Sequence, residues 1–268
     1  MLRSIRSEYL KVTTTRIWWI LAIILFGYVG LTSAGLAALF GGIANDPQGP
    51  ALPPEGIPPL IYSFATSVGY VFPLLFGALM TTGEFRYKTL TPTFLATPRR
   101  AVVLGGKVTV GLGFGAVYAV VALLASVGLG AIVLVATGTD TLLDQADTWA
   151  LIGRIVLALA LWTVIGTGLG VLVPNQVATI VIVLAFTQFV EPLLRFAAAF
   201  WDWTAAIGKF LPGAASDALV GSSVFTIAAT DGAVMQSLEW WQGGLVLACY
   251  AAVFLVAGAL TTWRRDVT

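Results

Sequence analysis

Residues 81–107 read TTGEFRYKTLTPTFLATPRRAVVLGGK, and they are the only long polar, basic segment between strongly apolar runs. Acidic and basic side chains are concentrated here, namely Glu84, Arg86, Lys88, Arg99, Arg100 and Lys107. Only 10% of the 268 residues are charged, whereas a soluble domain has about 25%. In such a chain, a polar segment between apolar runs predicts a connection that lies outside a membrane.

Composition makes a lipid bilayer the solvent of this chain. Hydrophobic residues make up 58% of it and the mean hydropathy is +0.93, so its surface is too apolar to face water. The net charge of +1 provides no basic domain, and no nucleic-acid partner is expected. The lack of histidine and the single Cys249 exclude His-ligated metal sites, Ser–His or Cys–His nucleophiles and an intrachain disulfide.

Six apolar runs predict an all-α polytopic membrane protein with a single transmembrane domain over residues 1–268. A helix rises about 1.5 Å per residue, so about 20 residues cross a hydrocarbon core of about 30 Å. The expected spans are residues 17–40, 60–80, 103–136, 150–173, 176–200 and 244–262. Pro73 is expected to kink the second span. Close helix contact in the third is expected at its small residues Gly111, Gly113, Gly115, Gly128 and Gly130.

The segments outside the spans differ in polarity. Residues 1–16 are basic, with a stripe at helical spacing that predicts a helix on the membrane surface, made of Leu2, Ile5, Tyr9 and Val12. Prolines and glycines make residues 41–59 an irregular loop, and residues 137–149 form an acidic loop. Broken apolar pieces in residues 191–243 predict short or re-entrant helices between the last two spans, held at an interface by Trp201, Trp203, Trp240 and Trp241.

Basic residues sort to one side of this topology. An even number of spans places both termini on the same side as residues 81–107. Eleven of the fourteen lysines and arginines fall on that side, and ten of the thirteen acids fall on the other. Because Lys and Arg accumulate on the cytosolic side of membrane proteins, we expect the termini and residues 81–107 to be cytosolic.

The chain has no nucleotide-binding loop. The phosphate-binding pattern is G-x-x-x-x-G-K-[ST], but Gly106–Lys107 and Gly208–Lys209 lack both the earlier glycine and the following hydroxyl residue. If ATP drives this protein, a separate chain must bind it.

Ionisable side chains are rare in the expected spans, which disfavours an ion-coupled carrier. Arg154 is expected to pair with Asp147 or Asp144 near the outer surface. Glu191 and Arg195 are four residues apart in the favourable order for a helical ion pair. Two interpretations stay open for these charges: local interfacial ion pairs, or a role near an outer gate.

Residues 83–107, GEFRYKTLTPTFLATPRRAVVLGGK, resemble the signature after the second span of type-2 ATP-binding-cassette (ABC) export permeases. The matching residues are Glu84, Thr89, Leu90, Phe94, Leu95, Thr97, Pro98, Arg100 and Lys107. Lys88 departs from the pattern, because a glycine is common at its position. The N-terminal RSEYLKVTTTRIWW and the segment LPGAASDAL (residues 211–219) are similar to parts of such permeases from high-GC Gram-positive bacteria. The resemblance therefore covers the whole chain.

The resemblance implies a non-enzymatic permease subunit in a bacterial plasma membrane. In this family two six-span subunits pair, as a homodimer or with a close homologue. Two separate ABC ATPase subunits bind ATP and Mg, so this chain is expected to bind no cofactor. A cytosolic coupling helix sits in a groove on the ATPase, and the resemblance implies that residues 81–100 form this contact through Glu84, Arg86, Lys88, Thr89, Leu90, Phe94, Thr97, Pro98, Arg99 and Arg100.

The residues themselves suggest how such a lever is built. Thr81-Thr82-Gly83-Glu84 fits a capping box, which predicts that a helix begins at Thr81. Pro98 is expected to end that helix, and Arg99 and Arg100 then meet acceptors on a partner. The competing interpretation is a solvated basic loop whose only role is to set the topology.

The spans offer few polar groups, so a hydrophobic or amphipathic cargo such as a drug, antibiotic or lipid fits better than a sugar or an ion. Candidates for the lining are Phe72, Phe76, Phe186, Thr187 and Gln188, although aromatic pairs on one helix face are also typical of packing. Two other functions stay open: a non-transporting membrane anchor for an ATPase, and a secondary carrier driven by an ion gradient.

Overall fold

The computed structural model describes residues 1–44, 54–198, 202–222 and 238–263, and within these ranges the chain forms helices and no strand. Six helical segments of this part are long and apolar enough to cross a membrane: Ile17–Ile43, Ile57–Arg86, Arg100–Ala136, Ala146–Leu172, Gln176–Ala197 and Trp240–Leu260. The protein is therefore a multi-pass helical membrane protein, and the predicted all-α polytopic fold is confirmed.

The spans are built from the following elements. The first is α2 (Ile17–Ala44), and the second consists of α3 (Ile57–Ser67) and α4 (Val71–Arg86). The third comprises α6 (Arg100–Leu123), the π-helix η2 (Leu124–Leu129) and α7 (Gly130–Ala136), and the fourth is α8 (Ala146–Leu172). The fifth comprises α9 (Gln176–Ala185), the π-helix η3 (Phe186–Val190) and α10 (Glu191–Ala198), and the sixth is α14 (Trp240–Leu260).

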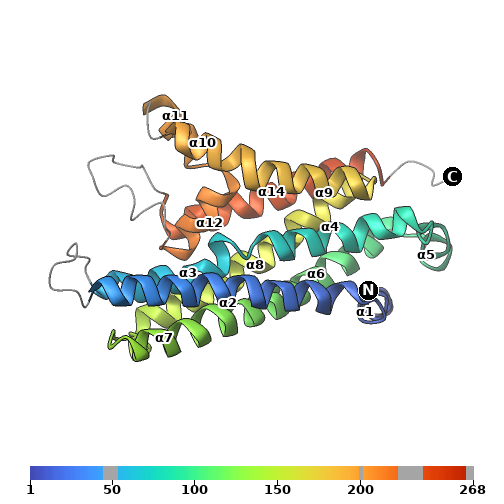
Figure 1. The fold of residues 1–268 in the computed structure, drawn as a ribbon. Coiled ribbons are helices and arrows are strands. Elements are labelled where there is room, and N and C mark those ends of the chain that lie inside the picture. The colour runs from blue at the N-terminus through green and yellow to red at the C-terminus, as the bar shows by residue number, and fades with distance from the viewer. Residues whose placement is uncertain (45–53, 199–201, 223–237, 264–268) are drawn as a thin grey trace.

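Short helices join or flank these spans. They are α1 (Leu2–Thr13), the 3₁₀ turn η1 (Pro54–Gly56), α5 (Leu90–Ala96), α11 (Asp202–Gly208) and α12 (Pro212–Val220). Figure 1 shows that the N-terminus, α5 and the last turn of α14 lie at one end of the bundle, which we call the terminal end. The start of α3, the loop before α8 and α12 lie at the opposite, distal end.

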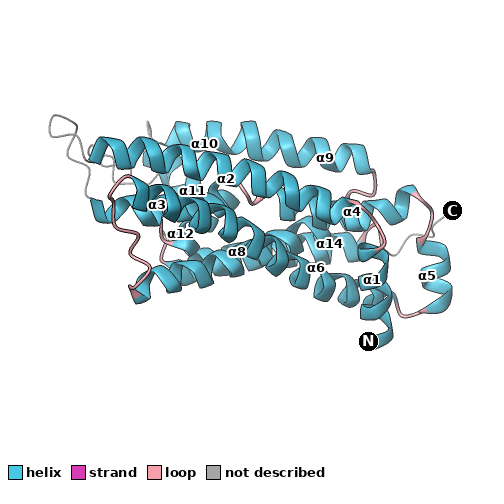
Figure 2. Ribbon diagram, turned by 60° about the horizontal axis from the view of Figure 1, so that its bottom comes forward, coloured by secondary structure: helices cyan, strands magenta, loops and turns pink. Residues whose placement is uncertain are grey.

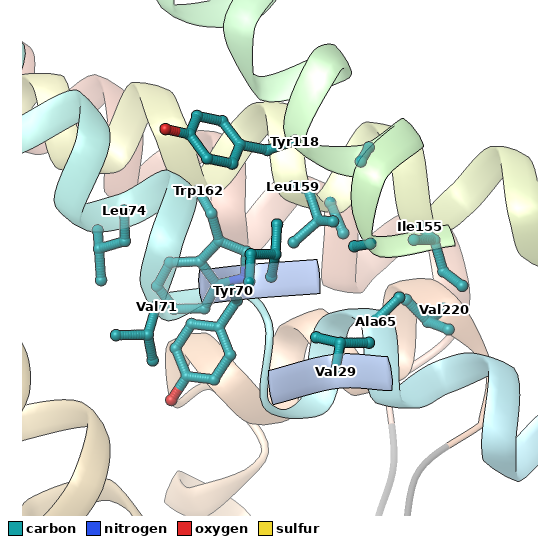
Figure 3. Packing of buried hydrophobic residues seen from close by; sticks show 14 of the residues in the cluster. Val29, Ala65, Tyr70, Val71, Leu74, Tyr118, Ile155, Leu159, Trp162 and Val220 are labelled. Atoms are coloured by element: carbon teal, nitrogen blue, oxygen red, sulfur yellow. The ribbon is translucent and has the colours of Figure 1, made fainter. Parts of the chain in front are cut away.

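Helix α8 is the centre of the bundle and makes its largest contacts with α4, α6 and α14. Figure 3 shows its Ile155, Leu159 and Trp162 among buried side chains of the surrounding helices. The backbones approach closely because small residues face each other. A methyl group at Gly166 would meet the carbonyl of Leu74 on α4, and one at Gly258 of α14 would meet the last turn of α8.

The glycine prediction for the third span is confirmed in part. A methyl group added at Gly111 or Gly115 would press on α8, and one at Gly130 would press on Ile61 of α3. Gly113 and Gly128 face open space in this chain. Helix periodicity places residues 111 and 115 on the face that meets α8 and turns residue 113 away from it.

The second span breaks before Pro73 rather than at it. Helix α3 ends at Ser67 and α4 begins at Val71, so Pro73 lies in the first turn of α4. Proline has no N–H and cannot donate to the carbonyl four residues earlier, which here belongs to Gly69. The N–H of Phe72 donates to that carbonyl instead, at 3.2 Å. A helix break in the middle of a span is therefore the local consequence of one proline.

Helix α1 is confirmed, and its apolar stripe is divided between a buried Val12 and exposed residues. Ser4, Glu8 and Val12 are buried against the protein, whereas Leu2 and Tyr9 of the apolar stripe are exposed. Figure 2 shows α1 running across the direction of the long helices. Its exposed apolar residues are those that a surface helix presents to lipid, so an interfacial position stays a prediction.

The predicted short helices between the last two spans are also confirmed. After α10 the chain forms α11, and α12 then packs against α3, α8 and α14. Trp201 lies outside the described residues, as does the side chain of Trp203, whereas Trp240 and Trp241 begin α14 and are exposed. Residues 45–53 of the expected irregular loop at 41–59 lie outside the described ranges, whereas both of its described ends are helical, because α2 continues to Ala44 and α3 begins at Ile57.

Candidate functional site

The predicted coupling segment forms a turn and a short helix rather than one helix from Thr81. Helix α4 continues to Arg86, and the hydroxyl groups of Thr81 and Thr82 donate to the carbonyls of Gly77 and Ala78 within it. The predicted capping box is therefore wrong. A threonine that bonds back four residues is satisfied inside a helix and needs no helix start.

The turn after α4 contains a residue in left-handed backbone. Lys88 has φ = 56°, which is left-handed backbone and favours glycine. Helix α5 then begins at Leu90 and ends at Ala96, before Pro98, so the prediction that Pro98 ends this helix is consistent with the structure.

Aromatic and cationic contacts fix α5 to the spans. Leu90 is fully buried, and the ring of Phe94 meets the ring of Trp263 at 5.3 Å. Arg100 lies over the Phe94 ring at 4.9 Å and donates to the Trp263 carbonyl at 2.7 Å. The sequence predicted that Leu90 and Arg100 contact a partner. In the structure they contact other residues of this chain instead.

The other face of α5 is open. Leu95 is 79% exposed and Tyr87 in the preceding turn is 70% exposed. Thr97 is half-buried, and the remaining predicted contact residues are exposed, namely Arg86, Lys88, Thr89, Pro98 and Arg99. Two exposed hydrophobic side chains beside exposed cations form a compact surface beyond the end of the spans, and we call residues 86–99 the α5 surface.

Four charged side chains, three of them buried and one partly exposed, link the elements that surround α5. Lys107 of α6 is fully buried between Glu8 of α1 and Glu84 of α4, with nitrogen–oxygen distances of 2.7 and 3.0 Å. Lys11 contacts the other oxygens of the same two carboxylates at 2.7 and 2.6 Å. We call Glu8, Lys11, Glu84 and Lys107 the charge cluster. Two cations neutralise two anions, so burial leaves no net charge.

The charge cluster corrects the role expected of Glu84. This residue is buried and cannot touch a partner directly, and it lies in the last turn of α4 rather than at the start of the next helix. Lys11 also donates to the hydroxyl of Thr93 at 3.2 Å, which joins the charge cluster to α5. Burial by itself lowers the pKa of Lys11, but the carboxylates of Glu84 and Glu8 together raise it above its ordinary value of 10.5.

A second polar site lies toward the distal end, inside the fifth span. The predicted pair is confirmed, with Arg195 Nε at 3.4 Å from Glu191 Oε1. Arg195 also contacts Asp217 of α12 at 2.8 Å. Glu191 Oε1 accepts hydrogen bonds from the backbone N–H groups of Gly213 and Ala214, at 2.6 and 3.2 Å, where the positive end of α12 favours a carboxylate.

These charges line a cavity of about 210 Å³, which we call the distal cavity. Of the residues predicted to line a substrate path, Thr187 and Gln188 line this cavity, and their role in transport stays a prediction. Phe186 does not line it, and Phe72 instead packs on Tyr28 with ring centroids 6.1 Å apart. The expectation that ionisable groups are nearly absent from the spans is wrong here, because Glu191 and Arg195 are both buried within the fifth span.

Phe76 does not share the surroundings of Phe72 although the two are four residues apart. Its ring packs on Phe114 and Tyr118, each with centroids 5.2 Å away. It also lines a separate cavity of about 390 Å³ at the terminal end, between α1 and α4. Phe72 and Phe76 therefore form no common wall, because one faces α2 and the other the core.

The expected ion pairs of Arg154 are wrong. Its guanidinium lies over the ring of Trp240, 4.9 Å from the centroid, and forms no ion pair with Asp147 or Asp144 in the described part of the chain. The tryptophan at the start of α14 offers a cation a contact that the sequence spacing does not reveal.

Several site residues escaped the sequence analysis. Glu8 and Lys11 belong to the charge cluster, Thr93 joins that cluster to α5, and Asp217 lines the distal cavity. Glu8 was recognisable only as one of the three acids on the basic side of the topology, and Glu84 was predicted as a contact for a partner instead of a buried ion pair. Nothing local pairs Glu8 with Lys107, 99 residues away, or Glu84 with Lys11, 73 residues away.

Comparison with protein-family models finds none that matches this chain, and no curated protein matches it either.

Proposed function

We propose that this chain is the membrane-spanning permease subunit of an ATP-driven ABC exporter that moves a hydrophobic or amphipathic compound outward. The observation that carries the proposal is the α5 surface, a rigidly held helix with exposed Leu95 and Tyr87 beyond the ends of the spans. In this proposal a separate ATPase, present as two copies per pair of permease subunits, binds ATP and Mg. The pattern around Glu84 and Thr97–Pro98 supports the same assignment.

In this proposal the terminal end faces the cytosol of a bacterium. The excess of lysine and arginine at the termini and in residues 81–107 supports that orientation. The α5 surface then faces the compartment in which ATP is available.

The contacts suggest a path for the push of the ATPase. Force on α5 passes through Thr93 to Lys11 and into the charge cluster, which joins α1, α4 and α6. It passes in parallel through Phe94 and Arg100 to the end of α14. Two attachments on opposite sides of a short helix make it a lever instead of a free loop.

The test is co-purification of the full chain from its native membrane, followed by ATPase measurement with a panel of hydrophobic compounds. Leu95→Asp is expected to abolish recovery of the ATPase, whereas Leu10→Asp carries the same change on exposed α1 and keeps it. Equal recovery with both variants contradicts docking on α5. Recovery of an ATPase without any compound moving in vesicles indicates the anchor instead of the exporter.

A gradient-driven secondary carrier is the second candidate, and the buried Glu191 and Arg195 of the fifth span favour it, because charges inside spans often mark ion pathways. Transport in vesicles that contain only this chain, and its loss when the ion gradient is collapsed, would replace the exporter by the carrier.

A further inference from the structure

We propose that the distal cavity binds the primary ammonium group of an amphipathic molecule, with Glu191 as the counter-ion. Calling that molecule a cargo rests on the proposed function, whereas its binding does not. Three irregular pieces of backbone meet at this cavity: the break between α3 and α4, the π-helix η3 and the start of α12. Irregular backbone inside a membrane is tolerated where it lines a cavity.

One acceptor in the distal cavity lacks a partner. Glu191 is 2% exposed, and its Oε1 is satisfied by α12, but its Oε2 is buried without any hydrogen bond among the described residues. The hydroxyl of Ser67 on the same wall is also buried without a bond. A buried carboxylate oxygen left unbonded is costly, so the site favours a ligand that donates a hydrogen bond.

The charges select a cation. Among the described lining residues, Glu191 and Asp217 are acidic and Arg195 is basic, and Arg195 contacts both carboxylates. An ammonium group brings a second cation to these two acids and donates to Glu191 Oε2, whereas an anion that has only acceptor atoms cannot donate to that oxygen. The rings of Tyr70 and Tyr28 also line the distal cavity and offer aromatic faces to a cation.

The size and the opening indicate an amphipathic molecule. A volume of about 210 Å³ holds an ammonium group and its first carbons, but not a drug-sized molecule. At the mouth Tyr28 is 46% exposed and Gln188 is exposed, so the distal cavity opens on the outer face of the bundle. Exposed apolar side chains such as Phe189 and Leu193 continue from there, and they give an alkyl chain a surface to follow.

The experiment uses the full chain in nanodiscs of phosphatidylglycerol, with binding measured by calorimetry. Dodecylamine is expected to bind, dodecyltrimethylammonium to bind more weakly because it has no N–H, and dodecanol to bind least. Glu191→Gln is expected to weaken dodecylamine binding by about tenfold or more and to remove its advantage over dodecanol. Tyr28 lies at the exposed mouth, so Tyr28→Leu is expected to leave the fold intact and to weaken dodecylamine binding by roughly fivefold. The control Phe26→Leu, on the same helix but away from the cavity, is expected to leave dodecylamine binding unchanged.

Equal binding of dodecylamine and dodecanol overturns the site, as does an unchanged preference for the amine in both Glu191→Gln and Tyr28→Leu. Phosphatidylethanolamine added to the nanodiscs identifies the source: competition indicates a lipid head group, and no competition indicates a free amine. None of these measurements involves an ATPase or nucleotide. Failure of amine binding therefore overturns the site alone, and failure of ATPase co-purification overturns the proposed function alone.

Discussion

Replacing Lys107 with methionine tests the charge cluster directly. The lysine is fully buried, so its loss exposes no new surface to water and leaves Glu8 and Glu84 sharing the half-exposed Lys11. Removing one partner of a buried ion pair costs about 3–5 kcal/mol. Because Lys11 still touches both carboxylates, we expect the lower end of that range, about 3 kcal/mol.

The same argument predicts that the double variant Glu84→Gln, Lys107→Met is less damaged than the sum of its two single changes, by on the order of 1–3 kcal/mol, because one anion and one cation then remain. Unfolding of the purified protein in mixed micelles with sodium dodecyl sulfate, followed by the fluorescence of its nine tryptophans, measures each variant. Lys88→Met makes the same change at an exposed lysine and is expected within about 0.5 kcal/mol of the wild type. A Lys107→Met variant as stable as this control, or strictly additive single changes, would refute the reasoning.

Three further predictions concern the fold. Lys88→Gly relieves left-handed backbone and is expected to raise the stability by about 0.5–1 kcal/mol in the same titration, and a fall would contradict the turn. Gly166→Ala places a methyl group against the Leu74 carbonyl, so it is expected to lower the free energy of unfolding by about 3 kcal/mol and to broaden the size-exclusion elution profile. In Gly27→Ala the added methyl group points into open space, so the elution profile stays sharp. Since the pKa of Lys11 is raised, this side chain keeps its charge at pH 10.5 and loses it as the pH rises through the raised value. The difference in melting temperature between the wild type and Lys11→Met is therefore expected to persist from neutral pH to pH 10.5 and to shrink above it.

The membrane spans were predictable because a bilayer imposes one length on every crossing helix, and each apolar run meets that requirement by itself. The pair of Glu191 and Arg195 was also predictable, because residues four positions apart on a helix are neighbours whatever surrounds them. The end of α5 before Pro98 followed from the chemistry of proline.

The contacts between distant segments were not predictable. Glu8 meets Lys107, and Arg195 meets Asp217, only because helices far apart in the chain pack together. The capping box failed because Thr81 and Glu84 fit the inside of a helix as well as its start. The sequence predicted a surface helix from the apolar stripe of α1 but did not reveal that the same helix buries Ser4 and Glu8, because that burial depends on its contact with α6.

The central position of α8 has a consequence for the synthesis of this protein. Helices α4 and α6, which are made before it, touch one another much less than each touches α8. At about 5–20 residues per second, the ribosome needs roughly 4–17 s to pass from the end of α4 to the end of α8. During that interval the glycine faces of α4 and α6 have no partner from their own chain. Helices α4 and α6 therefore enter the membrane loosely associated with each other, and the arrival of the fourth span is the step that joins them.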